Sequence, residues 1–302
     1  MALLDDEPRF GRVLTAMVTP FDEDGGLDLD AAANLADWLV SNGSDGLVLA
    51  GSTGESAVLS DSEEVALTKE VRKAVPDVPI LLGTGSNDTS YAVEATRRAA
   101  KLGVEGVLVV SPYYNRPPQV GIEQYYRAVA AATDLPVMLY DVPTRTGRHI
   151  STGTMLSLAH GVDNIVGLKD AGGNPTDTAK LLRDAPDDFV VYSGDDALTL
   201  PLLAVGAVGV ISVASHWVGK ELGEMVRAFE RGDVVAAASI NRRLISSYEF
   251  ESSDDAPNPI PTKAMLRYLG LDVGHCRPPM GPQPDWMASR AEEVNKQLVR
   301  QG

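Results

Sequence analysis

Lys169 is the side chain in this sequence whose surroundings best suit nucleophilic chemistry. It ends the apolar run Ile165–Lys169 and is followed by the glycine-rich stretch Asp170–Gly173. An apolar run of this length, bounded by glycines, is typical of a buried strand. A lysine at the end of such a strand loses hydrating water, which lowers the pKa of its ammonium group and frees the amine to attack a carbonyl. The alternative is a lysine that extends from the strand end into solvent.

A second candidate group is the pair of hydroxyls Ser52 and Thr53 in the stretch Gly51–Ser56. Two glycines on either side of the hydroxyls predict a tight turn. The backbone N–H groups and side chains of such a turn can hold a small anion such as a carboxylate. The alternative is a capped turn with no ligand.

Aromatic and basic side chains follow two further apolar runs. Tyr140 would lie beside Lys169 on the neighbouring strand, where its phenol could move protons for an activated amine; otherwise it is a core residue. Tyr114 lies in a proline-rich loop and could equally be a packing or interface residue. Arg145 could bind a carboxylate through two parallel hydrogen bonds, although a loop arginine is often simply solvated.

The elements that must position these residues repeat along the chain. Eight short apolar runs alternate with segments of helical periodicity, and helix-start signals such as the capping box Ser60–Glu63 precede several of those segments. The runs are Val13–Val18, Gly46–Leu49, Pro79–Leu82, Gly106–Val110, Pro136–Tyr140, Ile165–Lys169, Phe189–Ser193 and Gly209–Val213. This alternation predicts an α/β fold, a (β/α)₈ TIM barrel, whose chemistry lies at the carboxyl ends of the strands. An open doubly wound sheet is the alternative, but no Gly-x-Gly-x-x-Gly motif follows the first run.

Strand signals stop at about Val234. Beyond it, the pattern predicts helices over Val234–Phe250, Lys263–Leu269 and Pro284–Val299. We therefore expect a catalytic barrel over residues 1–233 and a C-terminal helical domain over residues 234–302.

Charge and composition exclude several classes of protein. The chain has 302 residues, 44% of them hydrophobic, and a formal net charge of −16, which disfavours binding to nucleic acid and to anionic membrane surfaces. A single cysteine, Cys276, excludes an internal disulfide framework and favours a reducing cytoplasm. Residues 1–12 lack the apolar segment of a signal peptide, and no stretch is long and apolar enough to span a bilayer.

The histidines show no metal-binding pattern. The four of them, His149, His160, His216 and His275, are scattered without ligand spacing, so neither a metal nor another cofactor is expected. This pattern argues against a metal-dependent class II aldolase.

Taken together, the motifs resemble the dihydrodipicolinate synthase / N-acetylneuraminate lyase family of pyruvate-dependent class I aldolases over nearly the whole chain. The motifs that carry the resemblance are Gly51–Glu55, Pro112–Pro117, Tyr140–Pro143, Gly167–Asp170, Ser193–Asp196 and Gly209–Ser212. The resemblance implies a TIM barrel with a C-terminal helical domain, assembled as a homotetramer of tight dimers.

The resemblance also implies roles for individual residues. Lys169 would form an imine with pyruvate, and Tyr140, Ser52 and Tyr114 would relay protons, Tyr114 acting from a neighbouring subunit. Thr53 and the backbone around Ile211 would hold pyruvate, assisted by a helix N-terminus after Gly54. For the Ser193–Asp196 motif we expect only a helix N-cap.

Within the family, two features favour the branch that condenses pyruvate with L-aspartate-4-semialdehyde, in the diaminopimelate route to lysine. They are Arg145, matched to the semialdehyde carboxylate, and the tail motif Pro257–Lys263. Two departures stand against them: Ser52 replaces a usual threonine, and Asp141 replaces a common asparagine. The alternatives are a pyruvate-dependent sugar-acid lyase or dehydratase with the same lysine, and a non-catalytic binding barrel.

The resemblance extends to a pocket where many relatives bind L-lysine as an inhibitor. The corresponding positions are Ser56, Ala57, Asp61, Glu64, Asn87, Tyr91 and Tyr113. Asp61 and Glu64 replace histidines of lysine-sensitive relatives, and Tyr91 replaces the glutamate that binds the ligand's ammonium group. We therefore expect weak or no inhibition by L-lysine.

Overall fold

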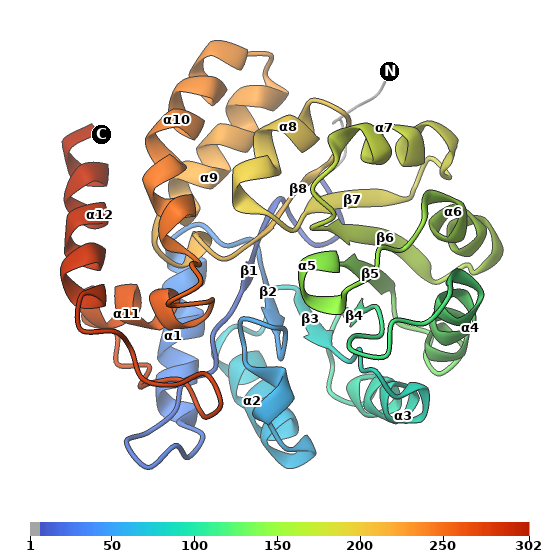
Figure 1. The fold of residues 1–302 in the computed structure, drawn as a ribbon, viewed down its shortest axis with the longest axis horizontal. Helices are drawn as coiled ribbons and strands as arrows, with labels where there is room; N and C mark the ends of the chain where they lie inside the picture. The colour runs from blue at the N-terminus through green and yellow to red at the C-terminus, as the bar shows by residue number, and fades with distance from the viewer. Residues whose placement is uncertain (1–6, 302) are drawn as a thin grey trace. The chain divides into compact units, whose positions relative to one another are not determined.

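The computed structural model describes residues 7–301, with side chains described as far as Val299; the first six residues, part of the segment examined for a leader, lie outside this range. Its eight strands follow one another in sequence order around a closed barrel. The strands are β1 Val13–Ala16, β2 Gly46–Leu49, β3 Ile80–Gly83, β4 Gly106–Val110, β5 Val137–Asp141, β6 Ile165–Asp170, β7 Val190–Ser193 and β8 Gly209–Ser212 (Figure 1). The predicted TIM barrel is confirmed, and the open doubly wound sheet is excluded.

Helices occupy the segments between the strands and the C-terminal part of the chain. Up to β8 they are α1 Leu29–Ser41, α2 Asp61–Ala74, α3 Thr89–Ala99, α4 Gln119–Ala130, α5 Pro143–Thr146, α6 Thr152–Gly161, α7 Pro175–Asp184 and α8 Thr199–Leu203. After β8 come α9 Ser215–Glu230, α10 Val234–Phe250, α11 Ile260–Tyr268 and α12 Met287–Gln301 (Figure 1). Two short 3₁₀ turns, η1 Ser56–Val58 and η2 Asp196–Leu198, follow β2 and β7.

The chain forms two compact units. Of the described residues, one unit comprises 7–12 and Pro79–Ile211, and the other comprises Val13–Val78 and 212–301. Helices α9 and α10, on either side of the boundary predicted at residues 233 and 234, pack against each other within the second unit. That boundary stays a prediction.

In the first unit, parallel strands β3 to β7 are buried along nearly their whole length. This burial explains why they consist of continuous apolar runs rather than alternating ones. The register of β5 and β6 places Tyr140 beside Lys169 and Asp141 beside Asp170. At the start of β8, Gly209 is required because a Cβ there would lie 2.1 Å from the Arg12 carbonyl oxygen.

In the second unit, an apolar cluster joins the C-terminal helices. Its buried members are Phe250, Ala256, Ile260, Ala264, Met265, Met287, Ala291 and Val294. Beside it lies a buried ion pair, Lys263 Nζ to Glu55 Oε1 at 2.7 Å, with 1% and 2% of the two side chains exposed. Burial lowers the pKa of the Lys263 ammonium group, and the Glu55 carboxylate opposes this shift.

Several helices and strands begin or end a few residues away from their predicted boundaries. α11 begins at Ile260 rather than Lys263 because Pro261 fits within the first turn of a helix, where its missing N–H is not needed. α12 begins at Met287 rather than Pro284. β1 ends at Ala16 rather than Val18, since the Val18 N–H donates to the His216 imidazole instead of to a neighbouring strand.

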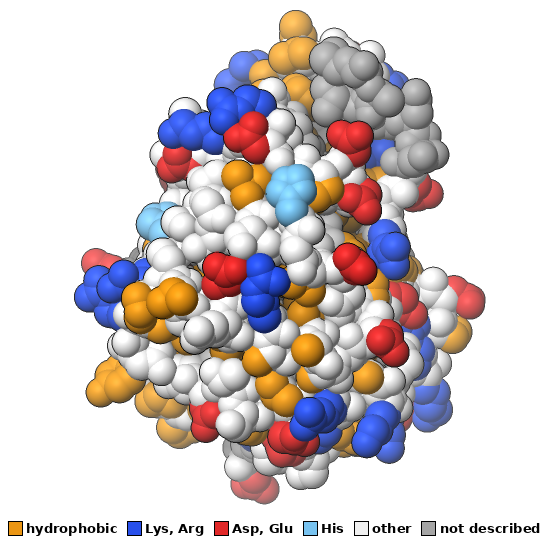
Figure 2. Space-filling model, turned by 90° about the vertical axis from the view of Figure 1, so that its right-hand side faces the viewer, with side chains coloured by type: hydrophobic (Ala, Val, Ile, Leu, Met, Phe, Trp, Pro, Cys, Tyr) orange, Lys and Arg blue, Asp and Glu red, His pale blue; other side chains and the backbone are white. Residues whose placement is uncertain are grey.

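On the face drawn in Figure 2, acidic and basic side chains are interspersed, and neither sign forms a continuous patch.

Between residues 7 and 301, no helix is long and apolar enough to cross a membrane.

We predict that Lys263→Met lowers the free energy of unfolding by about 3–5 kcal/mol, because it leaves the Glu55 carboxylate buried without its ion-pair partner. The double variant Lys263→Met/Glu55→Gln should lose less than this single variant, since no charge stays unpaired. Urea titration of the two variants and the parent chain measures the difference. Equal or greater destabilisation of the double variant would contradict the expected coupling.

Candidate active site

Lys169 and Tyr140 lie side by side near the carboxyl ends of β6 and β5. The strand register pairs them directly, and Lys169 Nζ is 4.4 Å from the centre of the Tyr140 ring. Both residues are buried, with 5% and 7% of their surfaces exposed. Their predicted adjacency is confirmed.

The surroundings of Lys169 favour a neutral amine. Burial lowers the pKa of its ammonium group from 10.5 to about 8, because loss of water disfavours the charged form. The Asp196 carboxylate opposes this lowering of the Lys169 pKa, and the Arg145 guanidinium reinforces it. A substantial fraction of Lys169 is therefore an uncharged nucleophile at mildly alkaline pH.

The motif after β7 leaves room for the Lys169 side chain. A Cβ at Gly194 would lie 2.9 Å from Lys169 Cγ and 3.1 Å from Lys169 Cε, so any other residue there would displace the lysine. Asp195 accepts hydrogen bonds from the first N–H groups of η2, which confirms the predicted N-cap. The next residue, Asp196, is buried, and its effect on Lys169 was not foreseen. The available signal was an acidic residue just after the strand next to β6.

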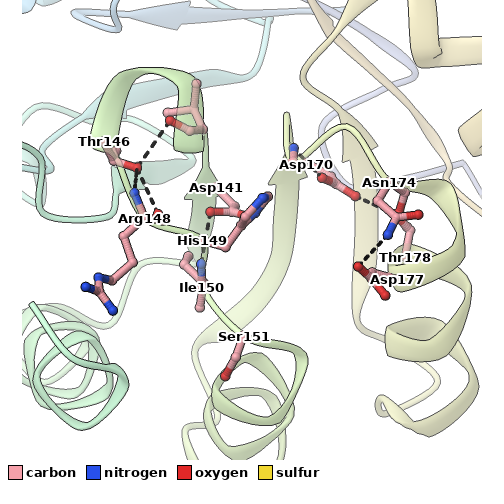
Figure 3. A network of polar contacts seen from close by, with 12 residues as sticks. Asp141, Thr146, Arg148, His149, Ile150, Ser151, Asp170, Asn174, Asp177 and Thr178 are labelled. Atoms are coloured by element: carbon pink, nitrogen blue, oxygen red, sulfur yellow. Dashed lines mark hydrogen bonds and ion pairs between the residues drawn. The ribbon is translucent and has the colours of Figure 1, made fainter. Parts of the chain in front are cut away.

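Arg145 lies in the short helix α5, and its side chain is exposed. The loop that carries Arg145 begins after Asp141, the last residue of β5, and the Asp141 side chain contacts the residues at the other end of that loop. Asp141 Oδ1 accepts a hydrogen bond from Ile150 N at 3.1 Å, and Asp141 Oδ2 lies 3.0 Å from His149 Nδ1 (Figure 3). Burial raises the pKa of the Asp141 carboxyl, and the His149 contact opposes this shift. The loop is therefore held at both ends by one side chain.

A second buried carboxylate, Asp170, lies next to Asp141 in the strand register. Its Oδ1 accepts a hydrogen bond from Gly172 N at 2.8 Å, and its Oδ2 accepts one from the Thr178 hydroxyl (Figure 3). A cavity of about 310 Å³ adjoins the two carboxylates and is lined by residues of β5, β6, α6 and α7. The hydrogen bonds of Asp141 and Asp170 fix the ends of the strands that carry Tyr140 and Lys169.

In the second unit, residues 51–56 form the predicted tight turn after β2. Glu55 N donates to Ser52 O at 3.1 Å, and Ser56 N donates to Gly51 O at 3.2 Å. Thr53 is buried and Ser52 is half-buried. The turn thus presents two neighbouring hydroxyls, as the sequence predicted.

The helix expected after Gly54 to assist pyruvate binding is not an α-helix at this point of the chain. The three-residue turn η1 follows instead, and the next α-helix begins only at Asp61, capped by Ser60. A 3₁₀ turn this short aligns too few peptide dipoles to act as a helix end. Any anion at this turn must therefore rely on its hydroxyls and backbone N–H groups.

The remaining predicted residues of the first unit lie in other elements. Tyr114 has a left-handed backbone, with φ of 71°, and 88% of its surface is exposed. Ile211 is buried in β8. The structure therefore brings Lys169 and Tyr140 together, with Arg145 near enough to affect the amine. It groups Ser52 with Thr53 in the other unit.

Across residues 7–301, no group of three or more His, Cys, Asp or Glu side chains is arranged to hold a metal ion.

Comparison with known proteins identifies relatives over nearly the whole chain. The model of the dihydrodipicolinate synthetase family matches residues 9–298. The 4-hydroxy-tetrahydrodipicolinate synthase of Moorella thermoacetica is 50% identical over 273 residues, which cover 90% of this chain and 92% of that protein. The synthase of the same name from Bacillus subtilis is 45% identical over 274 residues, covering 90% of this chain and 94% of the relative.

Solved structures give the same result. The Cyanidioschyzon merolae dihydrodipicolinate synthase, crystallised with lysine bound, superposes with a TM-score of 0.92 at 45% identity, covering 96% of this chain and 98% of that one. The Bacillus anthracis dihydrodipicolinate synthase DapA-2 has a TM-score of 0.92 at 42% identity, with the same coverage.

We predict that the reactivity of Lys169 titrates near pH 8, because only the uncharged amine is nucleophilic. Carbamoylation by cyanate, followed by mass spectrometry of the Lys169 peptide, should show a rate that rises through pH 8 and then levels. In Asp196→Asn the midpoint should move to lower pH, because the carboxylate that raises the Lys169 pKa is gone. A midpoint near 10.5, or one that does not respond to Asp196→Asn, would be inconsistent with this electrostatic account.

Proposed function

The chain belongs to the dihydrodipicolinate synthetase family, and on that premise we propose that it is a lyase acting through a Schiff base. It condenses pyruvate with L-aspartate-4-semialdehyde to give 4-hydroxy-tetrahydrodipicolinate, in the diaminopimelate route to lysine. The observation that carries this proposal is the buried amine of Lys169, with a pKa of about 8, beside the Tyr140 ring.

The chemistry begins with attack of the neutral Lys169 amine on the keto carbon of pyruvate. Loss of water leaves a protonated imine, which withdraws electrons and makes the neighbouring methyl group acidic. Removal of a methyl proton gives an enamine, whose carbon forms a bond to the aldehyde carbon of the semialdehyde. The amine of the semialdehyde then replaces Lys169 at the imine carbon, which closes the ring and releases the lysine.

Proton transfers require hydroxyl groups near the imine. We assign them to Tyr140, Ser52 and Tyr114. The family resemblance and the two hydroxyls of the turn after β2 support this assignment, and serine supplies the same O–H group as the threonine it replaces. The high exposure of Tyr114 suits a side chain that serves a neighbouring copy of the chain, which implies a homo-oligomer, in the family a homotetramer.

Substrate recognition falls to three other residues in this proposal. Thr53 and the backbone around Ile211 hold the pyruvate carboxylate and keto group. Arg145 binds the carboxylate of the semialdehyde. Its side chain is exposed, and a guanidinium can form two parallel hydrogen bonds to a carboxylate. No cofactor is required. The single cysteine supports a cytoplasmic location.

A substrate panel tests the proposal. Turnover of pyruvate with L-aspartate-4-semialdehyde, followed in a coupled assay, should greatly exceed cleavage of N-acetylneuraminate or of 2-keto-3-deoxygluconate. Preferential cleavage of either sugar acid would instead support the lyase alternative, which the relatives' names do not favour. No turnover of any of the three would support a non-catalytic barrel.

Arg145→Ala should raise KM for the semialdehyde roughly tenfold to a hundredfold, because a charged hydrogen-bonded contact contributes about 1.5–3 kcal/mol. KM for pyruvate should change much less. Steady-state kinetics with each substrate varied in turn separates the two effects. If both KM values rise together, Arg145 supports the structure of the site rather than the choice of the second substrate.

L-lysine at millimolar concentration should inhibit weakly or not at all. Asp61 and Glu64, in the first turn of α2, would repel the carboxylate of the amino acid, and Tyr91 offers no negative charge to its ammonium group. An inhibition curve at saturating pyruvate measures this. Half-inhibition well below a millimolar would show that these positions do not form the pocket.

A further inference from the structure

The tail motif around Asn258 makes a hydrogen bond to the turn after β2, across 205 positions of the chain. Asn258 Nδ2 donates to Thr53 Oγ1 at 2.9 Å, and Thr262 Oγ1, in the first turn of α11, donates to Asn258 Oδ1 at 3.0 Å. At least nine-tenths of each residue is buried: 4%, 7% and 0% of Thr53, Asn258 and Thr262 are exposed. Water cannot readily replace hydrogen bonds in such a setting.

We propose that Asn258 and Thr262 are positioning residues that turn the Thr53 hydroxyl into a hydrogen-bond donor for the carboxylate of the substrate. This inference rests on the proposed function, in which Thr53 binds pyruvate.

With Asn258 Oδ1 facing Thr262 and Asn258 Nδ2 facing Thr53, the chain of hydrogen bonds has one direction. A carbonyl oxygen only accepts, and an amide nitrogen only donates. Thr262 therefore supplies its hydroxyl proton to Asn258 Oδ1, which leaves the Asn258 amide nitrogen to donate to Thr53. Because Thr53 Oγ1 is already an acceptor in this bond, its own proton is directed to a different partner.

The described residues offer no other hydrogen-bond partner to the Thr53 hydroxyl. A donor held in a buried turn suits a carboxylate, since hydrogen bonds to a charged acceptor are the stronger kind.

The same turn is held from its other end. Glu55 has a left-handed backbone, with φ of 56°, which is unfavourable for a residue other than glycine. Its carboxylate pairs with Lys263 Nζ at 2.7 Å and accepts a hydrogen bond from Arg277 N at 2.9 Å. Gly54, between Thr53 and Glu55, is held as well, because its carbonyl oxygen accepts a hydrogen bond from the Thr19 hydroxyl at 2.6 Å. Thr53 thus lies in a turn that is held on both sides, and its hydroxyl accepts the hydrogen bond from Asn258.

Helix capping alone does not account for this arrangement. A local role in starting α11 would need only the contact between Thr262 and Asn258, four residues apart. The second bond, from Asn258 to Thr53, adds nothing to the helix. It does define which way the Thr53 proton points.

Two variants of nearly unchanged size test the direction of the bonds. Asn258→Asp replaces the donor with a second acceptor, which captures the Thr53 proton and turns a negative charge toward the turn. Thr262→Val removes the hydroxyl that orients the Asn258 amide. Thr262→Ser is the matched control, because it keeps that hydroxyl. For each we would measure kcat, KM for pyruvate, KM for the semialdehyde and the melting temperature.

We expect Asn258→Asp to raise KM for pyruvate by at least about tenfold, the effect of losing one hydrogen bond to a charged group. KM for the semialdehyde should change by less than about twofold, since that substrate does not meet Thr53. Thr262→Val should raise the pyruvate KM by a smaller factor, and Thr262→Ser should match the parent chain.

An unchanged pyruvate KM in a folded Asn258→Asp variant would overturn the inference, as would a parallel change in kcat, both KM values and melting temperature. If Asn258→Asp does not fold, Thr262→Val decides the matter by the same criterion. Failure of the proposed function has a different signature, because the parent chain itself would then not turn over pyruvate and the semialdehyde.

Discussion

Removal of one ammonium group from water is the constraint on which the candidate site depends. Lys169 is held near the end of a buried strand, and its pKa is lowered from 10.5 to about 8, mainly by burial. The parallel register places the lysine beside Tyr140 on β5, and the missing side chain of Gly194 leaves room for the lysine side chain. Asp196 limits the shift, so that the amine is neither permanently charged nor permanently neutral near physiological pH.

Other buried charged side chains in the chain have close ion-pair or hydrogen-bond partners, and this contrast identifies Lys169 as the reactive group. Lys263 is as deeply buried as Lys169 but pairs with Glu55 at 2.7 Å and donates to a backbone carbonyl, so it is a structural cation. Asp141 and Asp170 are satisfied by backbone N–H groups, a hydroxyl and an imidazole. These interactions hold rigid segments in place, whereas the Lys169 amine lies over an aromatic ring.

Short sequence patterns predicted the strands and the helix starts, because these elements depend on interactions between residues that are close in the sequence. Continuous apolar runs became buried parallel strands, the capping box at Ser60 begins α2, and the order of strands in a barrel brought Tyr140 to Lys169. Long-range pairs had no such signal. The bond from Asn258 to Thr53 joins residues that share no periodicity, and the short turn after Gly54 looked like the start of a helix. Asp196 was recognised as part of a motif, but its electrostatic role depends on three-dimensional proximity.

The central claim is that Lys169, and no other lysine, forms a covalent imine with pyruvate. Reduction with borohydride in the presence of pyruvate, followed by peptide mass spectrometry, tests it most directly. We predict one reduced pyruvoyl group per chain, on the peptide that contains Lys169, and none when pyruvate is omitted. Modification of Lys263 or of exposed lysines in its place, or no pyruvate-dependent modification at all, would contradict the account.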